Sequence, residues 1–287
     1  MNYRHVYHAG NFADVFKHAV LTRIIVYLQR KDAAFRVIDT HAGTGLYNLS
    51  SEAAMKTGEW RDGIGRLAEA KLPTNALALM QPYLDIALPM LAEKHATYPG
   101  SPLIARKLFR KQDRLTAIEL HPEDARYLAK QFAGDYQARI IELDGWLALG
   151  AHLPPKEKRG LVLIDPPFEE KGEFERMIDG VVKAHKRWPG GIYALWYPMK
   201  KRAEVVRYRN AIAACGVPNI IDAELSVRDT GGEKLDGCGL TIINPPFTLE
   251  TELRVMLAAL APMLEMEPRT ARWGVKRLVG EAQSSDS

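Results

Sequence analysis

The stretch FRVIDTHAGTGLY, residues 35–47, decides the fold. An apolar run ends at Asp39, and a turn containing Gly43 and Gly45 follows at once. In an open α/β sheet, ligands bind beyond the carboxyl ends of the strands, where glycines let the backbone approach a ligand. Asn48 stands where the dinucleotide fingerprint needs its third glycine, which disfavours a dehydrogenase. The turn fits S-adenosylmethionine (SAM) better than NAD, with a plain strand–helix turn as the alternative.

Further apolar runs rich in Val, Ile and Leu follow along the chain, and each stops at a polar residue, Gly or Pro. They are residues 115–122, 138–146, 160–168, 191–199, 220–228 and 239–247. Helical patterns such as residues 13–30 are interleaved with them. Such alternation indicates a buried, mostly parallel sheet with helices on both faces. The predicted class is α/β, a doubly wound, Rossmann-like sheet.

The segment 48–98 breaks this alternation, because residues 62–70 and 75–95 look helical and no convincing strand is found there. We interpret it as a small helical insertion after the first strand, with an elaborated crossover helix as the alternative. The predicted organisation is a sheet domain of residues 1–47 and 99–280, an insertion of residues 48–98, and a disordered polar end of residues 281–287.

Composition sets the remaining limits. The 287 residues are 47% hydrophobic and 26% charged, which excludes a disordered chain. A net charge of +4 permits a nucleic-acid partner without requiring one. Cys215 and Cys238 cannot supply a disulfide framework or a four-thiolate metal site. Without an apolar leader or a membrane-length apolar run, we expect a cytoplasmic protein with no membrane partner.

Acidic residues recur where later strands end. Glu119 ends one predicted strand, and its carboxylate could accept both ribose hydroxyls of an adenosyl group. Asp144 ends the next and could accept the adenine amino group, with Gly145 allowing close approach of the backbone. Alone, each could be a solvated or turn residue. Three acids at three successive strand ends, counting Asp39, predict a cofactor site.

The run LVLIDPPF, residues 161–168, ends in Asp165, Pro166, Pro167 and Phe168. An exocyclic adenine amine is a poor nucleophile, because its lone pair is delocalised into the ring. The Asp165 carboxylate and the Pro166 carbonyl can both accept its N–H bonds, which readies the nitrogen for attack on a sulfonium methyl group. Phe168 offers a face on which a flipped base can stack. The alternative is a rigid end to the strand.

The same pattern returns in TIINPPF, residues 241–247, as Asn244 followed by Pro245, Pro246 and Phe247. We expect only one of the two patterns to be catalytic. Asp165 falls on the fourth strand of the series, whereas Asn244 falls on the last predicted strand. A doubly wound sheet would place that last strand far from the first glycine turn, so we favour Asp165.

Basic residues cluster at 106–114, at 200–209 and near the C-terminus. Solvated faces are the ordinary interpretation of such clusters. Beside a base-methylating site, Lys200, Lys201 and Arg202 are the expected phosphate contacts, because they directly follow the strand next to that site.

Several blocks together carry a family resemblance. The blocks YRHVYHAGNFADVFKH, IDTHAGTGLY, YPGSPLIAR, ELHP, LIDPPF, YALWYP and INPPF resemble the bacterial 23S rRNA adenine-N6 methyltransferases of the J type, RlmJ. The resemblance covers most of the chain, to about residue 265. It implies a Rossmann-like methyltransferase domain with a small helical insertion, which uses SAM to methylate one adenine of large-subunit rRNA.

The resemblance also implies roles for matched positions. It implies SAM contacts at Lys17, His18, His41, Ser101, Glu119, Asp144 and Gly145, the amine acceptor at Asp165, and an RNA contact at Tyr3. Phe168 stands where the family has Tyr, which keeps stacking but loses any hydroxyl contact. From the residues alone, Lys17 and His18 lie in an amphipathic helix, where their side chains could be solvated or satisfied by neighbours, and Ser101 could simply cap a helix.

The resulting hypothesis is SAM-dependent N6-methylation of one adenine in naked or partly assembled 23S rRNA, by a monomer without a metal. His5 and His8 lack a third ligand for a metal site. A DNA adenine methyltransferase shares the motif but would be expected to carry a larger recognition region. A protein-glutamine methyltransferase would have Asn at Asp165, and a non-catalytic RNA-binding protein would not need Asp165 and Glu119.

Overall fold

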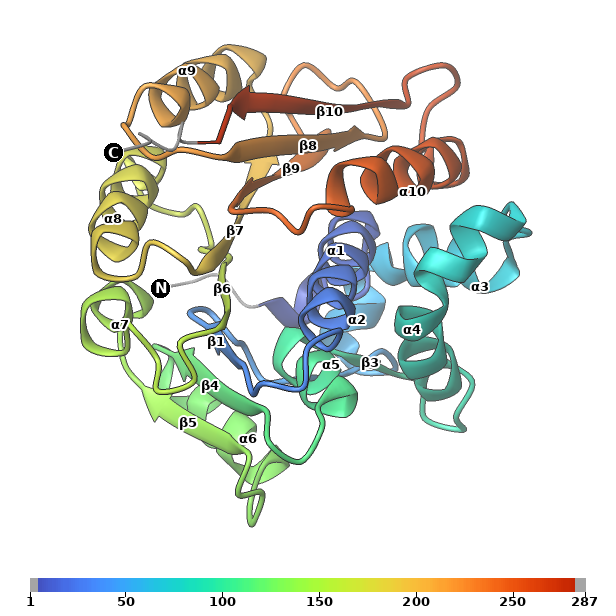
Figure 1. Ribbon diagram of the computed structural model, residues 1–287. Coiled ribbons are helices and arrows are strands. Elements are labelled where there is room, and N and C mark those ends of the chain that lie inside the picture. Colours follow the sequence, from blue (N-terminus) through green and yellow to red (C-terminus); the bar gives the residue numbers. More distant parts are fainter. Residues whose placement is uncertain (1–4, 282–287) are drawn as a thin grey trace.

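The apolar runs form the strands of one large sheet. A computed structural model describes residues 5–281 and contains, within them, an eight-stranded sheet of order β10-β8-β9-β7-β6-β1-β4-β5 (Figure 1). The strands are β1 (Arg36–Asp39), β4 (Arg114–Glu119), β5 (Ala138–Glu142), β6 (Gly160–Ile164), β7 (Ile192–Met199), β8 (Ile220–Ser226), β9 (Gly237–Ile243) and β10 (Arg272–Val279). This confirms the predicted α/β, Rossmann-like class.

Strand direction divides the sheet into two parts. The neighbours β7, β6, β1, β4 and β5 all run parallel. Beyond β7, each strand is antiparallel to its neighbour, with Tyr193 of β7 opposite Ile243 of β9. The carboxyl end of β9 therefore lies at the opposite edge of the sheet from the carboxyl ends of β6 and β7.

Strand β10 was not predicted from the sequence. It pairs with β8 at the edge of the sheet, where Arg272, Lys276 and Arg277 are exposed and Val275 is buried. Because one face of an edge strand meets solvent, its sequence RWGVKRLV lacks the continuous apolar run that marks the central strands.

Helices cover both faces of the sheet (Figure 1). The helices of one face are α1 (Phe12–Leu28), α5 (Ser101–Leu108), α6 (Pro122–Gln131) and α10 (Leu249–Leu264), and those of the other are α7 (Gly145–Ala151), α8 (Glu173–Arg187) and α9 (Arg202–Ala213). Alternate strand residues contribute to the two cores: Leu161 and Leu163 belong to one, Val162 and Ile164 to the other.

The segment that interrupts the alternation is helical. It contains α2 (Glu52–Thr57), the 3-10 helix η2 (Glu59–Asp62), α3 (Ile64–Glu69) and α4 (Thr74–Leu91). At its two ends, β2 (Leu46–Asn48) and β3 (Thr97–Pro99) pair antiparallel, so the chain leaves and returns at one place. Its status as a subdomain, with the predicted domain boundaries, stays a prediction. None of the described helices combines the length and apolar character needed to cross a membrane.

Helix α1 differs from the amphipathic helix expected there. The Asn11 side chain caps it by accepting hydrogen bonds from Ala13 N and Asp14 N. Every residue from Phe12 to Ile25 is buried, because α1 packs against the sheet and against α4, α5 and α10. The expectation that Lys17 and His18 could be solvated is therefore wrong, since they are only 4% and 1% exposed.

Candidate functional site

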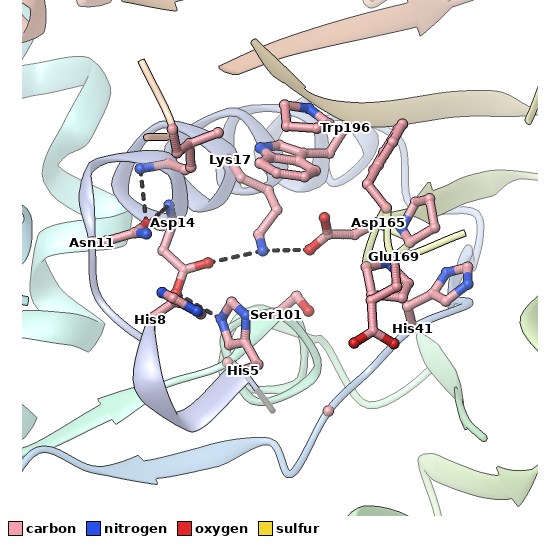
Figure 2. A pocket seen from close by; sticks show the side chains of 18 of the residues that line it. His5, His8, Asn11, Asp14, Lys17, His41, Ser101, Asp165, Glu169 and Trp196 are labelled. Atoms are coloured by element: carbon pink, nitrogen blue, oxygen red, sulfur yellow. Dashed lines mark hydrogen bonds and ion pairs between the residues drawn. The ribbon is translucent and has the colours of Figure 1, made fainter. Parts of the chain in front are cut away.

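A pocket of about 1140 Å³ lies where the parallel strands end. Its walls include most of the residues singled out from the sequence, several of them visible in Figure 2. They are Lys17, His18, His41, Gly43, Ser101, Glu119, Asp144, Gly145, Asp165, Pro166, Phe168 and Lys200. The loops after β1, β4, β5, β6 and β7 converge here, because the carboxyl ends of parallel strands share one edge of a sheet.

An ion-paired bridge runs through the centre of the pocket. Lys17 Nζ lies 2.8 Å from Asp14 Oδ1 and 2.5 Å from Asp165 Oδ2 (Figure 2). Burial opposes the charge on Lys17, but Asp14 and Asp165 hold its pKa well above the ordinary value. The ammonium is thus permanently charged and fixes the Asp165 carboxylate. Among residues 5–281, Asp165 Oδ1 has no hydrogen bond, so it is an acceptor on the pocket side.

The side of α1 that faces the pocket carries further polar groups. Asp14 is buried, which opposes its ionisation, but His5 and Lys17 hold its pKa well below the ordinary value. Burial lowers the pKa of His18 to about 3, so its ring is neutral. The ring accepts or donates one hydrogen bond at Nδ1, 2.7 Å from the Tyr98 hydroxyl. Its buried Nε2 has no hydrogen-bond partner in the described part of the chain.

The loops after β1 and β4 are joined by a carboxylate. Glu119 accepts hydrogen bonds from Gly43 N and His121 N, both at 2.8 Å, and burial raises its pKa. Gly43 has φ +60°, and a Cβ there would lie 2.1 Å from the Tyr47 hydroxyl, so only glycine fits. The Glu119 carboxylate is thereby fixed on the pocket wall.

The turn after β5 brings a second carboxylate to the pocket. Asp144 is the N-cap of α7, and its side chain accepts a hydrogen bond from Trp146 N at 2.8 Å. A Cβ at Gly145 would lie 2.3 Å from Thr40 O and 3.0 Å from the His41 ring. Asp144 can therefore cap the turn and face a ligand at the same time, so the two interpretations are compatible.

Asp39 departs from the sequence interpretation. Its side chain is 1% exposed and does not line the pocket, although His41 and Gly43 of the same loop do. Burial raises its pKa to about 7, with the Asp165 charge acting in the same direction. Its Oδ2 has no hydrogen-bond partner among the described residues. Asp39 is thus buried beside the loop that lines the pocket, and its role in holding a cofactor stays a prediction.

The Phe168 ring is held by other aromatic rings. Phe168 has φ +52°, a left-handed conformation that bulky residues rarely adopt. Its ring meets Phe174 edge-on at 4.9 Å between centroids and Trp196 at 6.1 Å. Phe174 in turn lies 4.8 Å from Tyr208, whose hydroxyl donates to Thr241 Oγ1 at 3.0 Å. This packing fixes the ring at the pocket wall.

The predicted RNA contacts fall in different places. Lys200 lines the pocket, but Lys201 and Arg202 do not, and Lys201 Nζ lies 3.6 Å from Glu204 Oε1. Tyr3 lies outside the described residues. No group of three or more His, Cys, Asp or Glu within residues 5–281 could hold a metal ion.

The sequence interpretation missed several residues of the pocket wall, among them Asp14, Trp196, Arg228 and Lys234. A signal existed for Asp14: its i+3 spacing to Lys17 puts both on one helical face. Trp196 lies inside an apolar strand, where nothing in the sequence separates a pocket residue from a core residue.

A Rossmann-like sheet whose parallel strands end in one pocket of carboxylates and glycines defines a class, the SAM-dependent methyltransferases. The comparisons with known proteins specify the family. The family described as "Ribosomal RNA large subunit methyltransferase D, RlmJ" matches residues 32–279. The chain therefore belongs to this family, and with it to the rRNA methyltransferases.

Relatives agree over almost the whole length. The Escherichia coli protein named "Ribosomal RNA large subunit methyltransferase J" is 42% identical over 266 residues, which cover 90% of this chain and 91% of the relative. Its namesake in Haemophilus influenzae is 39% identical over 283 residues, covering 98% and 100%. A crystal structure of a Legionella pneumophila protein has a TM-score of 0.85 at 33% identity, covering 94% of this chain and 98% of that one.

Proposed function

We propose that this protein transfers a methyl group from SAM to N6 of adenine 2030 in 23S rRNA, acting on naked or partly assembled large-subunit RNA. One observation carries the proposal: the Asp165-Pro166-Pro167-Phe168 turn lies in the same pocket as Glu119 and Asp144. A cofactor site and an amine-accepting site thus share one cavity.

The residues present fit SAM. Glu119 would accept the ribose hydroxyls, and Asp144 with Gly145 would receive the adenine. The unpartnered His18 Nε2 and the carboxylates of the pocket suit the polar, cationic amino-acid end. When bound, SAM supplies an electrophilic methyl group. His41 and Ser101 line the same pocket, and Lys17 acts through Asp165.

The chain's own residues would prepare the nucleophile. The target adenine leaves its stack and lies against Phe168, since a base inside a helix cannot reach the pocket. Its N6 donates to Asp165 Oδ1 and to the Pro166 carbonyl, which draws the lone pair out of the ring. The amine would form its bond to the methyl carbon as the bond from that carbon to the sulfonium sulfur breaks, leaving S-adenosylhomocysteine, and would then lose one proton to solvent. One chain supplies every group in this scheme, so the proposed working unit is a monomer.

The test is incubation of deproteinised 23S rRNA from a deletion strain with the protein and methyl-labelled SAM, followed by mapping of the modified base. We expect a single N6-methyladenosine in the RNA. Labelled DNA beside unlabelled RNA would instead indicate a DNA adenine methyltransferase. RNA binding without any label would indicate a non-catalytic RNA-binding protein.

A further inference from the structure

The two sides of the pocket differ in charge. Glu119 and Asp144 lie where β4 and β5 end, whereas Lys200, Arg228 and Lys234 follow β7 and β8, on the other side of β6 and β1 in the strand order, and all five line the pocket. Asp165 belongs to the same wall and follows β6, the strand next to β7.

The sheet register brings these three cations together. Lys200 follows β7, Arg228 lies just beyond β8, and Lys234 lies in the loop 229–236 between β8 and β9. Met199 and Ser226 are both opposite Gly237, so the end of β7, the end of β8 and the start of β9 share one rung. Since β7 and β6 are parallel, this rung is at the edge where Asp165 lies.

The loop 229–236 has a fixed shape. Asp236 accepts hydrogen bonds from Thr230 N and Gly232 N, both at 3.1 Å, and from Thr230 Oγ1 at 2.5 Å. Gly232 has φ +95°, and a Cβ there would lie 2.7 Å from Lys200 O, so the loop packs directly on the Lys200 backbone. Arg228 Nε donates to Leu235 O at 3.1 Å. These contacts fix the loop backbone and the Arg228 guanidinium before any ligand binds.

The charges of this cluster are available to an external anion. Within residues 5–281, Lys200, Arg228 and Lys234 form no ion pair. The loop also carries three acids: Asp229 and Glu233 are exposed, and Asp236 is hydrogen-bonded within the loop. On the facing wall, Glu59 bonds to His8 and Asn11.

The basic cluster 106–114 is different. Arg106 Nε lies 2.5 Å from Asp135 Oδ2, and Arg110 Nε lies 2.9 Å from Asp113 Oδ2. Arg114 donates to the Lys111 and Asp113 carbonyls. These arginines already have partners, so the cluster's charge is largely used inside the protein.

We propose that Lys200, Arg228 and Lys234 bind the backbone phosphates of the nucleotides next to the target adenine. This inference rests on the proposed function, and it assigns the RNA path to the loop 229–236 rather than to residues 201–202 or 106–114. A base that reaches Asp165 brings its phosphates to the same pocket, and cations are what a phosphodiester requires there.

The test compares two double variants with the same change in charge. Arg228→Gln with Lys234→Gln removes two cations of the proposed site, whereas Lys107→Gln with Lys111→Gln removes two exposed cations of the other cluster. Filter binding of deproteinised 23S rRNA between 50 and 200 mM salt gives affinity and salt slope. We expect the first variant to bind the RNA roughly tenfold more weakly. The slope of log affinity against log salt concentration should become shallower by about 1.4, because each lost contact with a single-strand phosphate contributes about 0.7.

The outcomes separate this inference from the proposed function. Equal losses in both variants, or an unchanged slope in the first, would overturn the inference. Affinity for SAM, measured by calorimetry, should stay unchanged in both variants, which checks that the first one folds. If the wild-type protein binds RNA with the expected variant pattern but does not methylate it, the proposed function fails while the phosphate site stands.

Discussion

Two turns with nearly the same sequence have opposite surroundings. After β6, Asp165-Pro166-Pro167-Phe168 lies in the pocket, with Asp165 bonded to Lys17 and Phe168 packed between rings. After β9, the Asn244 side chain donates to Pro189 O and Gly191 O, and Phe247 is 91% exposed. The first turn presents its groups to a ligand, whereas the second uses its polar group to hold a loop.

Strand direction explains the difference. Strand β9 is adjacent to β7 and only two strands from β6, so distance in strand order does not separate the two turns. However, β9 runs antiparallel to β7, and its carboxyl end meets residues 189–191, which precede β7. A strand-end motif therefore acts at the ligand edge only when its strand runs with the parallel set.

The strongest test of this contrast is Asp165→Ala. Loss of the carboxylate removes the acceptor for the target amine, and loss of one pre-positioned group of this kind costs about 10²- to 10³-fold in rate. We expect a fall of that size in kcat for methyl transfer from labelled SAM to 23S rRNA. Asp165→Asn keeps the shape and tests the charge. Wild-type activity in both variants would show that the first turn is not catalytic.

The two phenylalanines give the next largest effect. A base stacked on an aromatic ring gains about 1–3 kcal/mol, so Phe168→Ala should raise KM for RNA by about 5- to 150-fold. Phe247→Ala is the matched control, because the Phe247 ring is exposed and does not line the pocket, so KM should not change. Equal KM values for the two variants would contradict the stacking role of Phe168.

Asp165 of the first turn also acts through its charge on Asp39, the last residue of β1. Burial raises the pKa of Asp39 to about 7, and Lys17, Asp165, Ser101 and the His41 backbone N–H face its carboxyl. A bound cation favours the ionised form, which dominates only above that pKa. Affinity for SAM should therefore rise between pH 6 and pH 8, by up to about tenfold if only ionised Asp39 supports binding.

Other groups near the pocket require a control for this profile. The buried rings of His18 and His41, with pKa values lowered by burial to about 3 and about 4, do not titrate in this range. The hydrogen bond to Glu59 raises the pKa of His8 above 6.5, so His8 has to be controlled for. Asp39→Asn retains His8, so calorimetric SAM titrations of this variant should lose the slope due to Asp39. An identical profile in both proteins would exclude Asp39.

The sequence predicts those parts of the molecule whose burial leaves a pattern of apolar residues, and it misses those whose burial does not. Central strands are buried on both faces, so their apolar runs predicted them, and acids after β4 and β5 marked the pocket. Strand β10 escaped prediction, because its sequence RWGVKRLV contains no continuous apolar run. Asp165 was correctly placed at the pocket edge, but the argument from distance in strand order was wrong, because β9 is only two strands from β6. The direction of β9 separates the two turns, and the observed pairing of β7 with β9 gives that direction, whereas the apolar content of a strand does not.

The last contrast concerns stability rather than activity. Asn244→Ala removes the hydrogen bonds to Pro189 O and Gly191 O and places alanine at φ +52°. Two lost hydrogen bonds at about 1 kcal/mol each and about 1 kcal/mol of left-handed strain predict a loss of about 3 kcal/mol in unfolding free energy. Asn244→Gly loses the same bonds without the strain, so urea unfolding should find it about 1 kcal/mol more stable than the alanine variant. Because this turn is remote from the pocket, both variants should retain wild-type kcat for methyl transfer, and a loss like that of Asp165→Ala would reverse the assignment of the two turns.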